Sequence, residues 1–344
     1  MSLNTPETNP YIRDILNQPG ALARTIDLLV ERPDVIGAVR RATARIVLTG
    51  MGASYHALVP LYYVLASGGR DVHIVETSEL VHSLQGLLTS GSTLIVTSQS
   101  GESAEVVSLL SLVPDDVTVI GVTNTADGTL AAEADALVLT AAGIEHSVSS
   151  KTYTTALVAL HWLGRLLVGE DGIRAMTGLA ETAEAAARYL DEWSSHVDSM
   201  RSRVGDASTV TFVGRGVSLA TVGCGALILR ESAHVAAGGM SGAAYRHGPI
   251  EMASPGEYVV AFVGAGQVGA LVERLVADIR DVGGASDSVR VGTGAGPLVI
   301  PEVPMLLRPV LEILPAQVLS VALAERDGHS AGQFTRIDKV TTVE

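Results

Sequence analysis

A short apolar run that ends in a cluster of serines constrains the fold of this chain more than any other feature. The run occupies residues 94–96 and is followed by Ser98, Gln99, Ser100, Gly101 and Ser103. Such a run is typical of a strand buried on both faces of a parallel sheet. Apolar residues then recur at helical spacing from 104 onward, so we expect a helix to begin directly after the serines. The pattern predicts a strand-loop-helix unit of an α/β fold.

The serine cluster itself is a candidate anion site. Ser98, Ser100 and Ser103 provide hydroxyl donors beside a helix start, and Gly101 lets the backbone come close to a ligand. The loop contains no lysine or arginine and lacks the ending of a triphosphate loop. Neutral donors of this kind suit one phosphate monoester, as on a sugar phosphate. The alternative is a serine-rich helix cap without a ligand.

Composition and charge exclude several classes of protein. The 344 residues allow two domains, and 47% apolar residues with 36 glycines are typical of an α/β protein. A net charge of −14 argues against nucleic-acid binding. The single cysteine, Cys224, excludes a disulfide framework and a thiol-rich metal site. Without an uninterrupted apolar run of membrane length or an apolar N-terminus, we expect no membrane span, no signal peptide and a cytoplasmic location.

Strands and helices alternate through the first half of the chain. Strands are expected over 46–49, 72–75, 93–97, 117–122 and 136–139, which predicts a five-stranded parallel sheet covered by helices on both faces. The first strand leads into Gly50-x-Gly52-x-Ser54, where a tyrosine replaces the third glycine of a dinucleotide fingerprint. We reject a nucleotide site there and expect Ser54 to add a hydroxyl at the strand end. Ser149 and Ser150 precede a further long helix, as ligand groups or as caps.

A second copy of the unit follows a helical connector. Gly214, Gly216 and Ser218 repeat the first turn at a constant offset, and strands are expected over 209–213, 258–263 and 288–291. In place of the serine loop, this copy has a formal G-x-G-x-x-G at 264–269. No acidic residue for a ribose follows the next strand, so we expect no nucleotide there. The second copy is predicted to keep its sheet and to lack a phosphate loop.

Two residues of the second half are candidates for proton transfer. Glu231 is predicted late in a long, mainly apolar helix, where burial tends to raise the pKa of a carboxyl group. The alternatives are an exposed glutamate paired with Arg230, or half of a metal site with His234, for which no matching motif is visible. His247 precedes a Gly-Pro turn and suits proton transfer near pH 7. Lys339, near the C-terminus, is by itself typical of a solvated lysine.

Taken together, these motifs carry a family resemblance. The chain resembles the double SIS (sugar isomerase) domain proteins, above all the isomerase half of glutamine–fructose-6-phosphate aminotransferase. The likeness covers nearly the whole chain. It includes residues 14–19, 52–54, 98–103, 149–151, 230–231, 247–249 and the closing motif at 339–344. It implies two tandem SIS domains, each a five-stranded parallel sheet between helices. The expected divisions are N-terminal helices over 1–45, SIS domains over 46–168 and 207–327, a connector over 169–206 and a tail over 328–344.

The resemblance also implies a reaction and a set of site residues. The reaction is aldose–ketose isomerisation of a hexose or hexosamine 6-phosphate, with no cofactor and no metal. Glu231 would move a proton between C1 and C2, His247 would assist ring opening, and Lys339 would close over the sugar. The phosphate would be held by Ser54, Ser98, Gln99, Ser100 and Ser103, and the sugar by Gly52, Ser149 and Ser150. In this family the histidine commonly reaches the neighbouring subunit, which implies a homodimer with a shared site.

Departures from the aminotransferase pattern narrow the expected function. We expect no glutaminase domain. Ile228 replaces a lysine, and Ala244 replaces a glutamate before the histidine. Ala53 replaces a threonine in the first turn, and the arginine usually found before the terminal lysine motif is displaced to Arg336. We therefore expect an isomerase that releases ammonia from an amino-sugar 6-phosphate. A deglycase of fructosamine 6-phosphates and a non-catalytic sugar-phosphate sensor are the alternatives.

Overall fold

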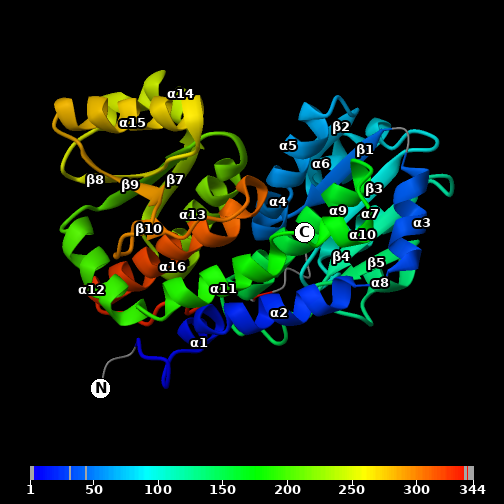
Figure 1. Ribbon diagram of the computed structural model, residues 1–344, viewed down its shortest axis with the longest axis horizontal. Helices are drawn as coiled ribbons and strands as arrows, with labels where there is room; N and C mark the ends of the chain where they lie inside the picture. Colours follow the sequence, from blue (N-terminus) through cyan, green and yellow to red (C-terminus); the bar gives the residue numbers. More distant parts are fainter. Residues whose placement is uncertain (1–3, 31, 43–44, 337–338, 340–344) are drawn as a thin grey trace. The chain divides into compact units, whose positions relative to one another are not determined.

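The computed structural model describes residues 4–30, 32–42, 45–336 and 339. Its contacts divide the chain into two compact units, both visible in Figure 1. Of the described residues, the serine-loop unit comprises those within 20–145 and 151–180, together with 336 and 339. The second unit comprises residues 4–19, 146–150 and 181–335. Each unit contains its own parallel sheet.

The sheet of the serine-loop unit has five parallel strands in the order β2-β1-β3-β4-β5. This confirms the expected five-stranded parallel sheet. Hydrogen-bonded pairing aligns Gly50 with Thr97, so the neighbouring strands β1 and β3 end at the same level of the sheet. The bounds are β1 Ile46–Gly50, β2 Val72–Glu76, β3 Thr93–Thr97, β4 Thr118–Thr123 and β5 Ala136–Leu139.

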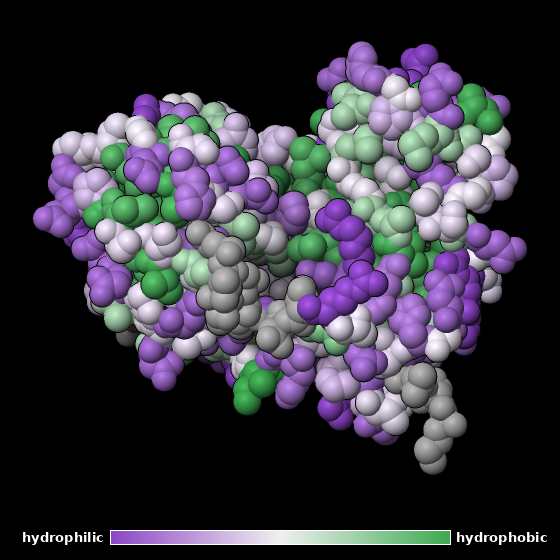
Figure 2. All heavy atoms as spheres, turned by 180° about the vertical axis from the view of Figure 1, so that it is seen from behind, coloured by the Kyte–Doolittle hydropathy of each residue, from purple (hydrophilic) through white to green (hydrophobic). Residues whose placement is uncertain are grey.

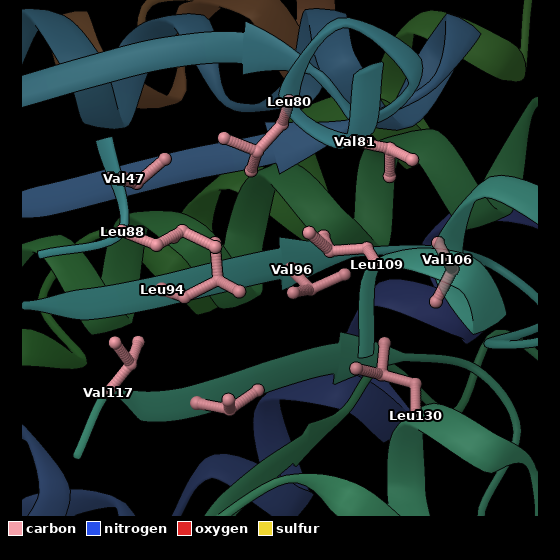
Figure 3. Close-up of a cluster of buried hydrophobic side chains, with 11 residues drawn as sticks. Val47, Leu80, Val81, Leu88, Leu94, Val96, Val106, Leu109, Val117 and Leu130 are labelled. Atoms are coloured by element: carbon pink, nitrogen blue, oxygen red, sulfur yellow. The ribbon is translucent and has the colours of Figure 1, made fainter. Parts of the chain in front are cut away.

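One face of this sheet is covered by an apolar cluster from strands and helices. Figure 3 shows Val47, Leu94 and Val96 of the strands beside Leu80 and Leu109 of the covering helices. These side chains are almost wholly buried, and burying an aliphatic side chain stabilises a fold by about 1.5–3 kcal/mol. The cluster is built on α6 Thr77–His82, η1 Gln85–Leu87, α7 Ala104–Leu110 and α8 Thr129–Glu133.

Alternate strand residues, such as Leu48 and Ile95, are buried on the other face. The central helix α9 Lys151–Leu167 packs there against α3, α4, α5 and β4. Because both faces are covered, strand β3 needs an uninterrupted apolar sequence. The remaining helices of this unit are α2 Gln18–Leu29, which begins in the second unit, α3 Pro33–Arg41, α4 Gly52–Ala57, α5 Val59–Ser67 and α10 Gly172–Ala175.

The sheet of the second unit has five parallel strands in the order β10-β9-β8-β6-β7. Numbered along the chain within each unit, both sheets have the order 2-1-3-4-5. The strands are β6 Thr209–Gly214, β7 Ala236–Ser241, β8 Glu257–Phe262, β9 Ala285–Val291 and β10 Val299–Ile300. Strand β7 was not predicted, because its sequence Ala-Ala-Gly-Gly-Met-Ser lacks the β-branched residues that favour strands.

Helices cover both faces of the second sheet as well. Helix α13 packs on β6, β7 and α16, and α15 packs on β8 and β9. The helices are α1 Pro10–Leu16, α11 Leu179–Leu190, α12 Trp193–Val204, η2 Gly216–Ser218, α13 Leu219–Ser232, α14 Gly242–Arg246, η3 Pro249–Met252, α15 Gly266–Asp281, η4 Met305–Leu307 and α16 Arg308–Arg326. The stretch Met305–Arg326 is apolar enough to cross a membrane, but 94% of its most apolar window is buried in the protein.

Hydrophilic side chains cover much of the face drawn in Figure 2, and apolar ones form scattered patches between them. This distribution accords with the net charge of −14. Cys224 is buried in α13 and is not in a disulfide. Among the described residues, no three His, Cys, Asp or Glu side chains gather as a metal site, and Glu231 and His234 are part of no such group.

Candidate functional site

The candidate site lies where two neighbouring strands of the serine-loop unit end. Strands β1 and β3 are adjacent in the sheet, although β2 lies between them in sequence. The chain therefore continues from β1 to one side of this point, towards β2, and from β3 to the other side, towards β4. In parallel α/β sheets such a switch point opens a crevice at the carboxyl ends of the strands, where ligands bind. The loops that follow are the turn with Gly52 and Ser54 and the serine loop, residues 98–103.

Backbone hydrogen bonds orient the hydroxyl groups of the serine loop. The N–H of Gly101 donates to Ser98 Oγ at 3.1 Å, and the N–H of Glu102 donates to Ser100 Oγ at 3.1 Å. Each hydroxyl accepts a bond and therefore keeps its own proton for a further acceptor. Ser98 is 8% exposed and Ser100 is half-buried. The loop thus presents oriented donors at the strand end.

Ser103 does not cap the helix that follows it. It occupies the N-cap position of α7, but its side chain makes no capping hydrogen bond. Gly101 takes a backbone φ of +68°, a conformation that other residues rarely adopt, and a β-carbon there would lie 3.1 Å from Cβ of Leu130. The sequence of the loop is therefore adapted to its backbone shape rather than to helix capping.

Two neighbouring elements hold the serine loop in place. The carbonyl of Gln99 accepts from the N–H of Asn124 at 3.1 Å, just beyond the end of β4. The side chain of Glu102 accepts from the N–H and, at 3.0 Å, from the hydroxyl of Thr129 at the start of α8. Sequence analysis missed Asn124 and Thr129, because both anchor the loop from distant positions with no recognisable motif.

The turn after β1 approaches the serine loop closely. A β-carbon at Gly50 would lie 2.8 Å from the carbonyl oxygen of Thr97, so glycine is needed for the two strand ends to pass. Gly52 has a φ of +52° and begins α4. Ser54 is half-buried in the first turn of that helix. The structure thus brings Gly52 and Ser54 to the same sheet edge as Ser98–Ser103.

A buried carboxylate fixes Lys339 in the same unit. Lys339 Nζ donates to Oε2 of Glu145 at 2.8 Å, and the Glu145 side chain is 0% exposed. Glu145 also accepts from the N–H of Thr152 at 3.0 Å and from its hydroxyl at 2.6 Å, in the first turn of α9. Lys339 is therefore not simply a solvated tail residue. Residues 340–344 of the closing motif lie outside the described residues.

The other expected site residues belong to the second unit. Glu231 lies one residue before the end of α13, as expected, and is half-buried, whereas Arg230 is exposed. His247 is exposed at the C-cap of the short helix α14, followed by Gly248 with a φ of +136°. Ser149 is half-buried and Ser150 is buried, directly before α9. These residues thus belong to one unit, and the serine loop belongs to the other.

Glu312 of the second unit is a carboxyl group whose pKa burial raises, and sequence analysis missed it. Its side chain is 1% exposed in α16, and burial raises its pKa to about 7. Ser218 Oγ bonds to it at 2.8 Å and Thr221 Oγ1 at 3.4 Å. Ser218 is the residue that the predicted repeat pairs with Ser54. Its hydroxyl is thus engaged by a buried side chain instead of facing a ligand.

The glycines of the G-x-G-x-x-G pattern at 264–269 have a structural role. A β-carbon at Gly269 would lie 2.5 Å from the carbonyl oxygen of Gly264, so this glycine permits α15 to pack closely on the end of β8. The next strand, β9, ends at Val291 and is followed by Gly292, Thr293 and Gly294. No carboxylate follows it at the position that binds a ribose in dinucleotide sites.

Comparison with known families defines the class of the serine-loop unit. Residues 39–163, from before β1 to within α9, match the SIS domain family. This segment is a SIS domain, and the resemblance inferred from the motifs is confirmed. Two curated relatives are glutamine–fructose-6-phosphate aminotransferases (isomerizing). That of Pyrococcus horikoshii is 31% identical over 351 residues, and that of Thermococcus kodakarensis is 28% identical over 357. Both alignments cover 97% of this chain, which spans only 57% and 58% of the relatives' lengths.

A solved structure shares the fold of most of the chain. The C-terminal domain of glucosamine-fructose-6-phosphate aminotransferase from Francisella tularensis superimposes with a TM-score of 0.82. The two sequences are 21% identical, and the match covers 94% of this chain and 98% of the Francisella tularensis chain. At these identities the likeness establishes the fold of the chain and not its reaction.

Proposed function

We propose that the protein is a phosphosugar isomerase that acts on an amino-sugar 6-phosphate. The observation that carries the proposal is the pair of serine hydroxyls, Ser98 and Ser100, oriented by backbone N–H groups at the switch point of the sheet. A phosphate monoester would accept their protons, with Ser54, Gln99 and Ser103 around it. Relatives named for a fructose-6-phosphate aminotransferase support this class of ligand.

The proposed reaction converts glucosamine 6-phosphate and water to fructose 6-phosphate and ammonia. Glu231 moves a proton between C1 and C2 of the opened sugar, and His247 assists ring opening. Lys339 places its ammonium group at the sugar. The hydroxyl groups of the sugar are bound by Gly52, Ser149 and Ser150. Electrostatic stabilisation of an anionic enediolate-type intermediate by a fixed cation is a strong catalytic effect. The ion pair with Glu145 supports such a fixed position for Lys339.

We further propose that the second unit is a diverged SIS domain and that two copies of the chain share each site. The matching strand order of the two sheets supports duplication. The bond from Ser218 to Glu312 engages the hydroxyl that would correspond to Ser54, which supports a ligand site in the first copy alone. A homodimer would allow His247 to serve the site of the neighbouring copy. A cytoplasmic location remains the expected compartment.

Two other functions remain open to test. A deglycase would release an amino acid instead of ammonia, and a sensor would bind sugar phosphate without turnover. Incubation with a panel of amino-sugar 6-phosphates and fructosamine 6-phosphates, with ammonia, free amino acid and ketose measured, separates all three. We expect ammonia and fructose 6-phosphate from glucosamine 6-phosphate. Binding without any product would favour the sensor, and amino-acid release would favour the deglycase.

A further inference from the structure

His247, the residue proposed to assist ring opening, lies at the end of a very short helix. Helix α14 has five residues, Gly242–Arg246, and His247 is its exposed C-cap. A helix of this length is not stable by itself in water, because it closes too few hydrogen bonds to offset the loss of chain entropy. The position of the imidazole therefore depends on the contacts that α14 makes with the rest of the second unit.

The inner side of α14 is attached to two adjacent strands through a buried polar network. Tyr245 is 0% exposed, and its hydroxyl donates to Oε2 of Glu257, at the start of β8, at 2.8 Å. Thr211 of β6 donates to the other carboxylate oxygen, Oε1, at 2.5 Å. Glu257 itself is 4% exposed. The network thus connects β6 and β8 to the residue that lies two positions before His247.

Two further contacts hold the end and the start of α14. Arg246 forms an ion pair with Asp278 of α15, which lies beside α14 (Figure 1). At the start of the helix, the N–H of Ala244 donates to Oγ of Ser241 at 3.1 Å, and Ser241 is the last residue of β7. Together with the bond of Tyr245, these contacts attach a five-residue helix to three strands and one long helix.

Stability alone does not favour the network around Glu257. Removing a carboxylate from water is costly, and neutral hydroxyl donors offset only part of that cost. The Tyr245 ring already packs in an apolar core with Val213 and Leu275, which apolar side chains in place of the network would extend. What the hydrogen bonds add is a defined geometry, because they hold the Tyr245 ring, and with it the backbone of α14, in one position.

We propose that Tyr245 is a positioning residue that acts through Glu257 and Thr211 to fix α14 and so to present His247 at one defined place. The inference rests on the proposed function for the role of His247. A proton-transfer group must lie within hydrogen-bond reach of the sugar, and a displacement of about 1 Å can cost a hundredfold in rate. Because the phosphate is proposed to be held by the serine loop, loss of the network should lower turnover and leave KM nearly unchanged.

Replacing the network by apolar residues of similar shape tests the proposal. The triple variant Thr211→Val/Tyr245→Phe/Glu257→Met removes all three polar side chains together, so it should resist urea at least as well as the native chain. We expect its turnover of glucosamine 6-phosphate to fall by roughly ten- to a hundredfold, with KM within about twofold of the native value. Tyr245→Phe alone should give the same split between turnover and KM, and it provides the test if the triple variant does not fold.

Tyr258→Phe is the matched control. Tyr258 is 2% exposed, lies on the same strand as Glu257, and donates its hydroxyl proton to Oδ2 of Asp287 at 2.8 Å. The variant loses an equivalent bond between a tyrosine and a carboxylate outside the network that holds α14, and its turnover should equal that of the native chain. Equal losses of turnover in Tyr245→Phe and Tyr258→Phe would give the network a purely structural role and overturn the proposal.

Nitrogen-15 relaxation of the His247 N–H reports on its position independently of turnover. We expect an order parameter near 0.85, typical of rigid backbone, in the native chain and in Tyr258→Phe, and a value below about 0.6 in the triple variant and in Tyr245→Phe. If the native chain turns over no sugar phosphate, the proposed function is wrong, and the order parameters alone then decide whether the network positions His247. Native order parameters in both variants that lack the Tyr245 hydroxyl would overturn the proposal, whatever the turnover.

Discussion

Lys339 Nζ lies 2.8 Å from Oε2 of Glu145, a carboxylate that is 0% exposed and also bonded to Thr152. A residue near the C-terminus is thereby attached to the first turn of the central helix α9. A buried carboxylate without its cation is costly, because the charge has lost its hydration. The lysine therefore supports the fold of the serine-loop unit as well as any role at the sugar.

Replacement of Lys339 by methionine should reduce both stability and turnover. The variant keeps the apolar stem and removes the charge that lies 2.8 Å from the Glu145 carboxylate. We expect the free energy of unfolding to fall by about 2 kcal/mol, between the values for exposed and fully buried pairs. Urea unfolding measures this loss, and steady-state assays measure the loss of turnover.

The double variant Lys339→Met/Glu145→Gln separates the two roles of the lysine. Removing the buried charge should restore much of the stability, because glutamine needs no cation, and turnover should stay low. A double variant as active as the native chain would show that Lys339 has no part in the reaction. A single variant as stable as the native chain would show that the ion pair adds nothing to the fold.

Loss of the two serine hydroxyls should weaken sugar-phosphate binding. Neutral hydrogen bonds contribute about 0.5–1.5 kcal/mol each, and bonds to a charged group contribute more. Ser98→Ala/Ser100→Ala should therefore lower the affinity for a hexose 6-phosphate by roughly ten- to a hundredfold, measured by calorimetry. Ser111→Ala, at the exposed end of α7, is the matched control. If the double variant and the control bind the sugar phosphate with equal affinity, Ser98 and Ser100 do not bind its phosphate group.

Glu312 should make the stability of the protein depend on pH. Its pKa is about 7 in the folded chain, against the ordinary value of 4.5 for a solvated glutamate, so the folded state holds the proton more tightly. The stabilisation from this proton is complete below pH 4.5 and disappears as the pH rises through 7. The pKa difference corresponds to about 3 kcal/mol at 1.36 kcal/mol per pH unit.

Urea unfolding between pH 5 and 8 tests this linkage. Glu312→Gln should flatten the pH dependence over this window relative to the native chain. Glu133→Gln, on the exposed side of α8, should follow the native curve. If the native chain and Glu312→Gln have parallel curves, the buried carboxyl group does not titrate in this range.

Much of the fold was predictable because its strands are short apolar runs followed by glycine or serine turns. The sequence around Val96 indicates a strand buried on both faces, and β3 and its serine loop occur where expected. Strand β7 was not predictable in the same way, since Gly238 and Gly239 carry no strand signal. It forms because its backbone pairs with β6, which is a tertiary effect.

The candidate site was only partly predictable, for a related reason. Serines at a strand end are visible in the sequence, and Ser98 and Ser100 are oriented as donors in the structure. The partner of Lys339 could not be predicted, because Glu145 is distant in the chain and belongs to no ligand motif. The raised pKa of Glu312 could not be predicted either, because no local sequence pattern distinguishes this residue from an exposed helical glutamate. Its burial in the folded chain raises its pKa to about 7.

If two copies of the chain share each site, a mixture of two inactive variants should regain activity. Glu231→Gln and His247→Ala should each be inactive alone. If His247 serves the neighbouring copy, a hybrid dimer contains one site in which both residues are native. Mixing the two variants under conditions of proven subunit exchange should therefore restore part of the turnover. No recovery would mean that each chain supplies both residues to its own site.

Isotope exchange with Glu231→Gln tests whether the protein is an isomerase at all. Moving a carbonyl between C1 and C2 requires a base that removes a proton from one carbon and returns it to the other. Glutamine retains the size of Glu231 but cannot carry the proton, so Glu231→Gln should bind sugar phosphate normally. Its turnover should fall by roughly two to four powers of ten, the usual effect of losing a general base.

In heavy water, the native chain should introduce deuterium at C1 or C2 of the sugar phosphate, and Glu231→Gln should not. Ser111→Ala serves again as the control and should exchange like the native chain. Exchange that persists in Glu231→Gln would assign the proton transfer to another base. If the native chain binds hexose and hexosamine 6-phosphates but exchanges no deuterium into any of them, the protein is a sensor, because enolisation is the step that every aldose–ketose isomerase working by proton transfer must catalyse.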